Sequence, residues 1–258
     1  MSGRFLLLRA DPIEQPAAKV PDVEADVARA VALSHLGALP PGRVDPLVAA
    51  ARRATIPAGA VIHWVGEDAP HVDLVVSGVV RAFVTAPDGR TMTVRYARVG
   101  ALLGVMSLYA PGFALPATVQ ALTDAVVLRL PPHIVRQSAD RDVEVTKALL
   151  VDQAERALAF LCELPGSAFA SVTQRVVRHL LDLASHDLSR AERPAGRPVL
   201  VARVTQSDLA DAVGSVREVV VRVLRQLRDD GLIDTGRDGI VIVDPERLVA
   251  EHGWNAGS

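Results

Sequence analysis

The sequence is poor in cysteine and in lysine. Its one cysteine, Cys162, excludes an intramolecular disulfide, and no zinc or iron–sulfur site can be built from cysteines within one chain. A reducing cytoplasm is therefore the expected setting. Only two of the 28 basic residues are lysines, Lys19 and Lys147. This bias towards arginine is compositional and carries no functional conclusion.

Long apolar runs are also missing. No stretch approaches about 18 uninterrupted apolar residues, so we expect no membrane span. The short apolar run at the N-terminus ends at Asp11 and Pro12, too early for a signal peptide. The formal net charge is −2, so no overall field draws the protein to nucleic acid or to a membrane surface. Any anion binding must come from a local group of charges.

Catalytic motifs are absent from the sequence as well. It contains no recognisable Ser/His/Asp or Cys/His set, no metal-ligand cluster and no phosphate-binding glycine loop. The glycines of "VVSGVV" and "RVGALLG" have the spacing of turn glycines rather than of a dinucleotide fingerprint. We therefore expect a protein that is not an enzyme and that holds no metal.

The spacing of apolar residues changes twice along the chain. Residues 1–21 contain three prolines and no clear period, which predicts a mobile arm. Helical spacing follows over 22–36 and 44–53. From 55 to 130, short β-rich runs separated by turn residues predict an antiparallel barrel or sandwich, with a hairpin at "APDGR", residues 86–90.

A long helix is predicted after the barrel. It begins at residue 142 and is expected to end at Pro165 and Gly166. Its apolar stripe is wide enough to face both the barrel and a second copy of the helix, which favours a homodimer over a helix packed only on its own domain. The stripe consists of Leu150, Val151, Ala154, Ala157, Leu158 and Leu161. Another amphipathic helix, "VTQRVVRHLLDLAS", and a charged loop over 189–198 follow.

Two helical patterns then meet at one glycine in "TQSDLADAVGSVREVVVRVLRQL", residues 205–227. Thr205 can cap the first helix, and Gly214 supplies the positive φ of a tight turn. The second helix, 216–229, has an apolar face and a polar face. Four arginines and one glutamate give residues 215–228 a local charge of +3. A β-hairpin follows, so the pattern is that of a winged helix-turn-helix.

The polar face of the second helix suits the major groove of DNA. Arg217 and Arg222 can each donate two hydrogen bonds to guanine, and Glu218 can accept one from cytosine. Glu218 and Arg222 are four residues apart, so each could orient the other. An ordinary helical hairpin with a solvated face would explain the charges. It would not explain the glycine turn, the base-reading side chains and the following hairpin together.

Barrel, long helix, helical pair and hairpin together resemble the CRP/FNR family of bacterial transcription regulators, from about residue 36 to residue 244. The helical pair matches the family pattern Thr-x-x-(acidic)-Leu-Ala-x-x-Val-Gly followed by Arg-Glu-x-x-x-Arg. The resemblance implies an α+β fold. Its parts are an N-terminal antiparallel β-roll or jelly-roll sensor domain (22–141), a dimerisation helix (142–165) and a C-terminal winged helix-turn-helix domain (166–258), preceded by the arm 1–21.

The same resemblance implies partners and DNA contacts. Double-stranded DNA, a second copy of the chain and RNA polymerase would be the partners. Val216 and Val219 stand where the family often has Ser and Thr that reach phosphates, which predicts weaker backbone anchoring without loss of specificity. The implied DNA-binding residues are Arg217, Glu218 and Arg222 at base edges, and Thr205, Gln206 and Arg225 beside the backbone.

The sensor domain departs from the family's cyclic-nucleotide cassette. Gly104 is kept, but Val105 replaces the Glu that holds the ribose. Leu115 and Pro116 replace the Arg that pairs with the phosphate and its Ser or Thr neighbour. On the long helix, Phe160 and Leu161 replace polar residues that meet the base. A cyclic phosphate buried without its Arg is unfavourable, so we expect that cAMP is not bound in the usual mode.

Three interpretations of this degenerate pocket remain open. In the first, an apolar set of residues forms a filled core and the regulator needs no ligand there. This set consists of Val105, Leu108, Phe113, Leu115, Phe160 and Leu161. In the second, the DNA binding of this sensor depends on an unidentified effector other than cAMP. In the third, haem is bound as in some family members. The possible axial ligands are His63, His71, Met92 and Met106. Cys162 is expected to be a buried apolar residue rather than a redox switch.

Overall fold

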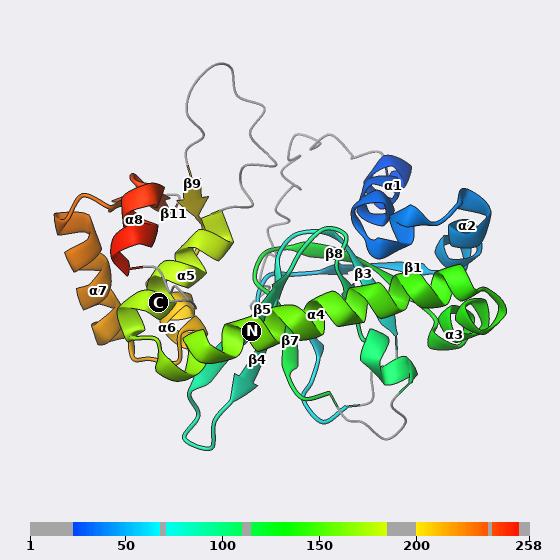
Figure 1. Cartoon of the computed structure of the whole chain (residues 1–258), viewed down its shortest axis with the longest axis horizontal. Helices are drawn as coiled ribbons and strands as arrows, with labels where there is room; N and C mark the ends of the chain where they lie inside the picture. The colour runs from blue at the N-terminus through cyan, green and yellow to red at the C-terminus, as the bar shows by residue number, and fades with distance from the viewer. Residues whose placement is uncertain (1–22, 68–70, 110–114, 185–199, 237–238, 253–258) are drawn as a thin grey trace, which may run out of the picture.

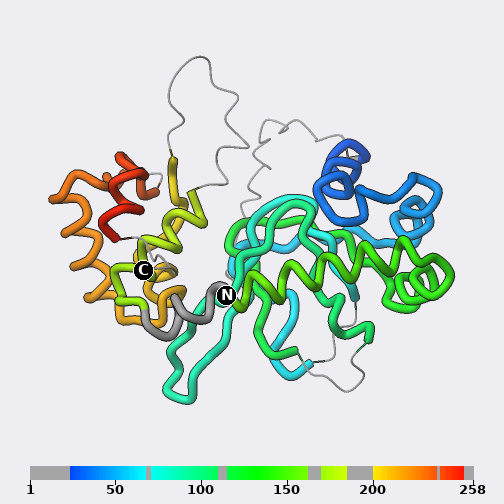
Figure 2. The backbone as a smooth tube through the Cα atoms, in the orientation of Figure 1, coloured from blue at the N-terminus to red at the C-terminus, as the bar shows by residue number. Residues whose placement is uncertain are grey.

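A computed structural model of the chain describes residues 23–67, 71–109, 115–184, 200–236 and 239–252, with the backbone alone over 162–169. The predicted arm 1–21 and the loop 189–198 lie outside these residues. Figures 1 and 2 show two bodies, a larger one built around β-strands and a smaller, mainly helical one, connected by one long helix. None of the helices in the described part combines the length and the apolar character that a membrane crossing requires.

Three short helices precede the barrel. They are α1 (Val23–Leu33), the 3-10 helix η1 (His35–Ala38) and α2 (Pro41–Ala50). The prediction of a second helix over 44–53 is displaced, because proline at the first turn favours a start at Pro41 and strand β1 already begins at Arg52. Leu36 and Leu47 are buried against the barrel strands.

The central domain consists of two four-stranded antiparallel sheets, in the strand orders β1-β8-β3-β6 and β2-β7-β4-β5. This arrangement confirms the predicted antiparallel roll, including the hairpin between β4 and β5. The strands are β1 (Arg52–Ile56), β2 (Val61–His63), β3 (Val72–Ser77), β4 (Val80–Thr85), β5 (Thr91–Ala97), β6 (Leu102–Leu103), β7 (Thr118–Ala121) and β8 (Ala125–Leu130).

A buried polar pair connects the two sheets. His63 on β2 and Asp73 on β3 are 2% and 0% exposed, and His63 Nε2 lies 2.7 Å from Asp73 Oδ2. Arg129 on β8 lies further away, with Nε 3.7 Å from the other carboxylate oxygen. Burying a carboxylate without a hydrogen-bond partner costs free energy of folding. The contact between His63 and Asp73 therefore fixes the position of one sheet relative to the other.

The long helix α4 (Val143–Phe169) follows α3 (Pro132–Arg141) and runs along the barrel (Figure 1). Its inner face is buried and includes Val145 and Leu149. Leu150, Leu158 and Leu161 on the outer face are 60% or more exposed. The predicted end at Pro165 and Gly166 is wrong, since the helix continues to Phe169. A proline inside a helix removes one N–H donor and crowds the carbonyl four residues before it, which bends a helix without always ending it.

The C-terminal domain is built from α5 (Val172–Ala184), α6 (Gln206–Ala212), α7 (Arg217–Asp229) and α8 (Pro245–His252) around one apolar core. A three-stranded sheet in the order β10-β11-β9 covers one side, with β9 at Leu200–Ala202, β10 at Ile233–Gly236 and β11 at Gly239–Ile242. The helices predicted from residues 172 and 205 are confirmed, and α8 was not predicted.

Candidate nucleic-acid interface

Helix α6 begins at a side-chain cap. The Thr205 hydroxyl accepts a hydrogen bond from the Asp208 amide at 3.1 Å and donates one to the Asp208 carboxylate at 2.7 Å. The predicted cap is therefore confirmed. Both bonds use the Thr205 hydroxyl, so a DNA phosphate would have to share it. Leu209 and Ala210 are buried, and the small Ala210 lies among the core residues that α6 shares with α7.

The turn between α6 and α7 is held from two sides. Gly214 has φ +64°, the left-handed conformation that its position predicted. The Ser215 amide donates to the Ala210 carbonyl at 3.0 Å. Arg175 on α5 donates from Nε to the Val213 carbonyl at 2.9 Å and from Nη1 to the Ala170 carbonyl at 2.8 Å. Arg175 thus holds the turn that sets the direction of α7.

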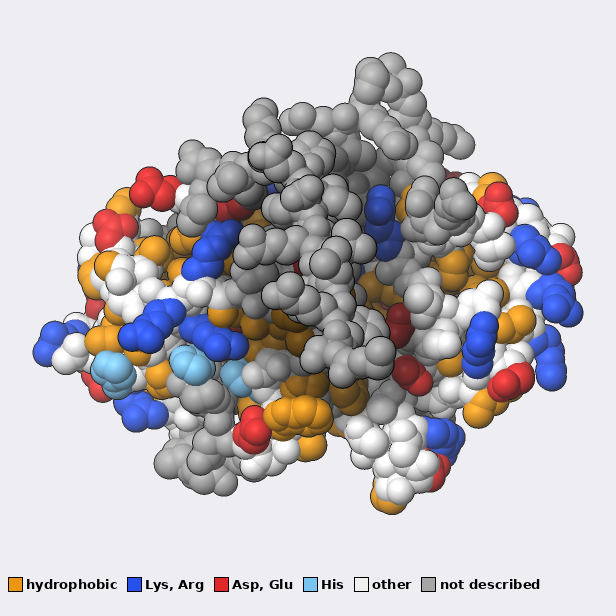
Figure 3. All heavy atoms as spheres, turned by 180° about the vertical axis from the view of Figure 1, so that it is seen from behind, with side chains coloured by type: hydrophobic (Ala, Val, Ile, Leu, Met, Phe, Trp, Pro, Cys, Tyr) orange, Lys and Arg blue, Asp and Glu red, His pale blue; other side chains and the backbone are white. Residues whose placement is uncertain are grey.

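Helix α7 separates its apolar and charged residues by face. Val220, Leu224 and Leu227 are buried in the domain core. On the opposite face the charged side chains are exposed, namely Arg217, Glu218, Arg222 and Arg225. In Figure 3, basic side chains gather along the right-hand edge, the end of the molecule formed by this domain. The local positive face predicted from the sequence is therefore present on the surface.

The predicted pairing of Glu218 with Arg222 is not formed. Within the described residues, neither side chain makes an ion pair or a side-chain hydrogen bond. An exposed i,i+4 pair contributes only about 0.3–0.5 kcal/mol, too little to hold two long side chains against solvent. Both groups are consequently free to turn towards an external partner.

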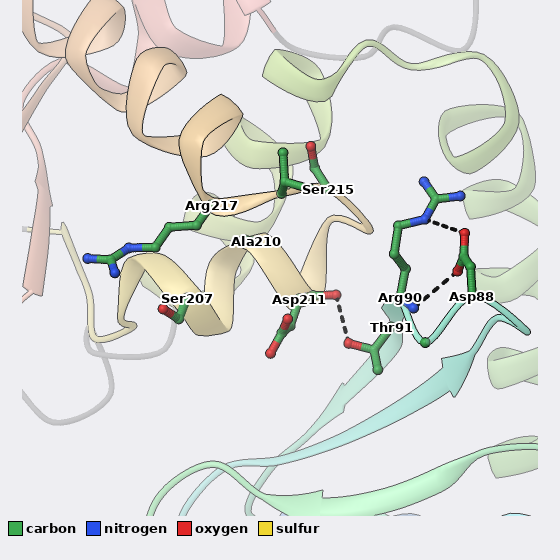
Figure 4. Close-up of a pocket in the computed structure, with 10 residues that line it drawn as sticks. Asp88, Arg90, Thr91, Ser207, Ala210, Asp211, Ser215 and Arg217 are labelled. Atoms are coloured by element: carbon green, nitrogen blue, oxygen red, sulfur yellow. Dashed lines mark hydrogen bonds and ion pairs between the residues drawn. The ribbon is translucent and has the colours of Figure 1, made fainter.

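The barrel touches this helical pair, which sequence reasoning missed. The β4–β5 hairpin reaches α6, where Thr91 Oγ1 donates to the Asp211 carbonyl at 3.3 Å and Met92 forms a β-bridge with Val213 (Figure 4). Directly after β5, Arg98 donates to the Asp182 carbonyl at 3.1 Å. These contacts join residues about 84 to 120 positions apart, and no local pattern announces them.

An aromatic contact completes the junction between the domains. The Tyr96 ring meets the edge of His179 on α5, with 5.6 Å between ring centroids and 87° between the ring planes. Burial, together with the positive charges of the neighbouring Arg178 and Arg175, lowers the pKa of His179 to about 3. Burial also raises the pKa of the Tyr96 phenol to about 12. Both groups are therefore neutral at physiological pH, as an interface of low polarity requires.

Comparison with known proteins matches both parts of the chain. Residues 53–142 match the cyclic nucleotide-binding domain and residues 174–251 match the Crp-like helix-turn-helix domain. The chain is 32% identical to the transcriptional regulator LdrP of Thermus thermophilus over 192 residues, covering 74% of this chain and 92% of that protein.

The chain belongs to the CRP/FNR family of transcriptional regulators. Another relative is the cAMP-activated global transcriptional regulator Vfr of Pseudomonas aeruginosa, 27% identical over 79% of this chain and 94% of Vfr. Among solved structures, the c-di-GMP responsive regulator CLP of Xanthomonas campestris has 26% identity and a TM-score of 0.65, over 79% of this chain and 99% of CLP. Like its family, the protein is a DNA-binding transcriptional regulator and not an enzyme.

The residues at the family's nucleotide cassette differ in burial. Gly104, with φ +79°, begins the 3-10 helix η2 (Val105–Leu108), and Val105 is 2% exposed in the barrel core. Leu115 is partly buried and Pro116 is exposed. Phe160 and Leu161 on α4 are also exposed, at 52% and 60%. Phe113 lies outside the described residues, and a role of these residues in effector binding stays a prediction.

A cyclic nucleotide in the family's usual mode does not fit the residues present. The cassette positions offer neither a cation nor a carboxylate. The partly buried guanidinium of Arg156 lies beside the cassette, donating to the Leu102 carbonyl, but its charge is already paired with Asp152 at 2.8 Å. A phosphate there would compete with this carboxylate and would lie close to its negative charge.

The four possible haem ligands are scattered. His63 is bound to Asp73, Met92 takes part in the bridge to Val213, and Met106 is 53% exposed on η2. His71 is partly buried. Among the residues that the structure describes, no group of three His, Cys, Asp or Glu side chains could hold a metal ion. The side chain of Cys162 lies outside the described residues.

Proposed function

We propose that the protein acts as a homodimer that reads a palindromic DNA site through α7. The observation that carries the proposal is the outward face of α7, where Arg217, Glu218 and Arg222 are exposed and unpaired within the described residues. A guanidinium can bond guanine at two atoms, and a carboxylate can accept from the cytosine amino group. The bound site should therefore contain G·C pairs in each half, with Thr205, Gln206 and Arg225 beside the phosphates.

The dimer would form along the outer face of α4. Leu150, Val151, Leu158 and Leu161 are large apolar side chains that remain exposed on one chain. With Ala154 and Ala157 they follow the 3-4 spacing of a coiled-coil seam. A two-fold dimer demands an inverted repeat, with half-site centres about one helical turn or roughly 34 Å apart.

The barrel would act as a sensor that does not take cAMP in the usual mode. This rests on Val105, Leu115 and Pro116 at the cassette positions and on the paired state of Arg156. The second candidate is a sensor module whose DNA binding depends on an unidentified effector other than cAMP. Haem is the less favoured effector, since His63 is only 2% exposed, whereas Met106 is 53% exposed on the surface.

The remaining proposals concern organisation and setting. Residues 22–141 would form the sensor domain, 142–165 the core of the dimer seam and 166–258 the DNA-binding domain, with α4 crossing the last boundary. We place the protein in the cytoplasm, where promoter DNA and RNA polymerase would be its partners.

Selection of bound sequences from a random DNA pool tests the proposal. We expect an enriched inverted repeat with G·C pairs, whose preference at one base pair per half-site is relaxed by Arg217→Ala. Sedimentation in the same buffer should give a dimer at micromolar concentration. An enriched sequence without dyad symmetry, or one unchanged by both Arg217→Ala and Glu218→Ala, would show that α7 is not the reader.

A further inference from the structure

The tip of the β4–β5 hairpin lies beside the DNA-facing end of the helix-turn-helix. A groove of about 410 Å³ separates the two, lined by Asp88 and Arg90 from the barrel and by Asp211, Ser215 and Arg217 from the DNA-binding domain, among others. In Figure 4, Arg217 extends to one side of α6, whereas Arg90 stands on the other side, near the turn that carries Ser215. The barrel thus presents a guanidinium at the side of α6 opposite to Arg217.

Hydrogen bonds within the hairpin tip and contacts with α6 hold the segment that carries Arg90 in place. The Ala86 amide donates to the Arg90 carbonyl at 2.8 Å, and the Gly89 amide donates to the Ala86 carbonyl at 2.9 Å. The Asp88 carboxylate accepts from the Arg90 amide at 3.2 Å and from Arg90 Nε at 2.8 Å. The Thr91–Asp211 bond and the Met92–Val213 bridge then fix the tip against α6.

Arg90 keeps binding capacity beyond its bond to Asp88. Its side chain is 62% exposed, and within the described residues its two terminal amino groups have no hydrogen-bond partner. An exposed ion pair such as Asp88–Arg90 is weak, because water solvates both charges. A phosphate can therefore share or replace the carboxylate as the partner of the guanidinium.

Two positions at the start of α7 lack a side chain that could fill this role. The side chain of Val216 is 53% exposed and offers no donor, and that of Val219 one turn later offers none either. A recognition helix in the major groove has phosphates on both sides of it, and contacts to them fix its register. The two valines therefore add no phosphate contact to any that the Ser215 hydroxyl of the turn can make.

We propose that Arg90, a residue of the sensor barrel, contacts the DNA backbone beside the turn of the helix-turn-helix. This inference rests on the proposed reading of DNA by α7. Because the contact comes from the barrel, a part of the DNA affinity depends on the hairpin remaining docked on α6. Any event that shifts the hairpin would then weaken DNA binding without altering α7 itself.

The test compares five variants of the full-length protein, without RNA polymerase, on a selected site and on random DNA over a range of salt concentrations. Arg90→Ala should weaken both complexes by a similar factor. It should also reduce the slope of log affinity against log salt by about 2 per dimer, one phosphate for each chain. Arg90→Lys, which keeps the charge, should retain most of the slope. Arg53→Ala removes an exposed arginine of β1 and serves as the matched control.

Asp88→Asn should change DNA affinity in the opposite direction, since it releases Arg90 and removes a negative charge near the phosphates. We expect tighter binding to both DNAs. Unchanged or tighter binding by Arg90→Ala, or weaker binding to the selected site alone, would overturn the inference. Arg217→Ala in parallel separates this failure from that of the proposed function. If Arg217→Ala also leaves binding to the selected site intact, the reading of DNA by α7 has itself failed.

Discussion

The arginines that pack inside or against the barrel differ from those of α7 and from Arg90 at the hairpin tip. In the barrel, Arg81 bonds Gln120 at 3.0 Å and stacks 4.7 Å from the Phe83 ring centre. On α3, Arg136 donates to the Leu108 carbonyl, and on α4, Arg156 is paired with Asp152. On α7, Arg217 and Arg222 are exposed and, in the described part of the chain, unpaired.

Because of this difference, the exposed face of α7 can bind anions more readily than the interior of the barrel can. In the proposed complex, DNA phosphates and base edges would meet guanidinium groups on α7 that lose only water on binding. An anionic effector in the barrel would compete with the hydrogen bonds and the ion pair that Arg81, Arg136 and Arg156 already make within the protein. The two parts of one family fold have therefore diverged in how readily they bind negative charge.

The largest expected effect comes from breaking the dimer that presents two α7 helices together. Leu158→Glu places a charge on the apolar seam of α4, so we expect a monomer by sedimentation. The affinity for a palindromic site should fall by a factor on the order of 100 or more, because each half-site is then bound alone. Leu33→Glu changes a leucine of similar exposure, 59% against 62%, on α1 and should remain dimeric. A dimeric Leu158→Glu protein would contradict the seam.

A second prediction sharpens the comparison at single residues of α7. Arg217→Ala should cost about 1–3 kcal/mol on the selected site, because a two-point contact to guanine is lost. Arg225→Ala, as a phosphate contact, should weaken selected and random DNA alike and flatten the salt dependence. Fluorescence anisotropy titrations at several salt concentrations measure both effects. Equal losses on random DNA for the two variants would deny Arg217 a base-reading role.

A third prediction concerns the buried neutral histidine of the DNA-binding domain. His179 has a folded pKa of about 3, so below its unfolded value of about 6.5 only the unfolded chain takes up the proton. Stability should therefore fall as the pH falls, by about 2 kcal/mol between pH 7 and pH 5 from this group alone. Urea unfolding at both pH values measures the loss.

The matched variants are His179→Phe and His133→Gln. His179→Phe should remove this part of the pH dependence, whereas His133→Gln, at an exposed histidine, should keep it. An identical pH slope in His179→Phe and the unaltered protein would mean that His179 is protonated in the folded state.

The smallest expected effect is that of cAMP on the barrel. Millimolar cAMP should leave the melting temperature and the DNA affinity nearly unchanged, since the cassette lacks its cation. A ligand of micromolar affinity at that concentration would add about 4 kcal/mol of stability, so the measurement is decisive. If calorimetric titration gives one cAMP site per chain with micromolar affinity, the barrel does bind an anionic ligand. The proposed difference in anion binding between the barrel and α7 would then be wrong.

The sequence was most informative where the structure is local. The cap at Thr205, the positive φ of Gly214 and the division of α7 into two faces follow from spacing over a few residues. The alternation of short strands likewise predicted the antiparallel roll. The pairing of Glu218 with Arg222 failed because spacing allows an exposed pair without making it stable.

The contacts that the spacing of residues did not predict are those between residues far apart in the sequence. Nothing in "APDGR" indicates that the hairpin would reach Asp211, 120 positions away from Thr91. The bond between His63 and Asp73 depends on the stacking of two sheets, and neither strand alone predicts it. The cassette residues were equally hard to place from the sequence. The replacement of family residues by Val105 and Phe160 does not show whether these two side chains face one space, because that depends on how η2 and α4 pack.

The contact of Tyr96 with His179 limits how freely domains of this family can be recombined. Tyr96 and Leu122 belong to the barrel, yet they pack against the core of the DNA-binding domain. A chimera that joins this DNA-binding domain to another regulator's barrel would lose both side chains unless the new barrel supplies equivalents. Exchanges of sensor domains should therefore succeed most readily when an aromatic residue at the position of Tyr96 is carried along.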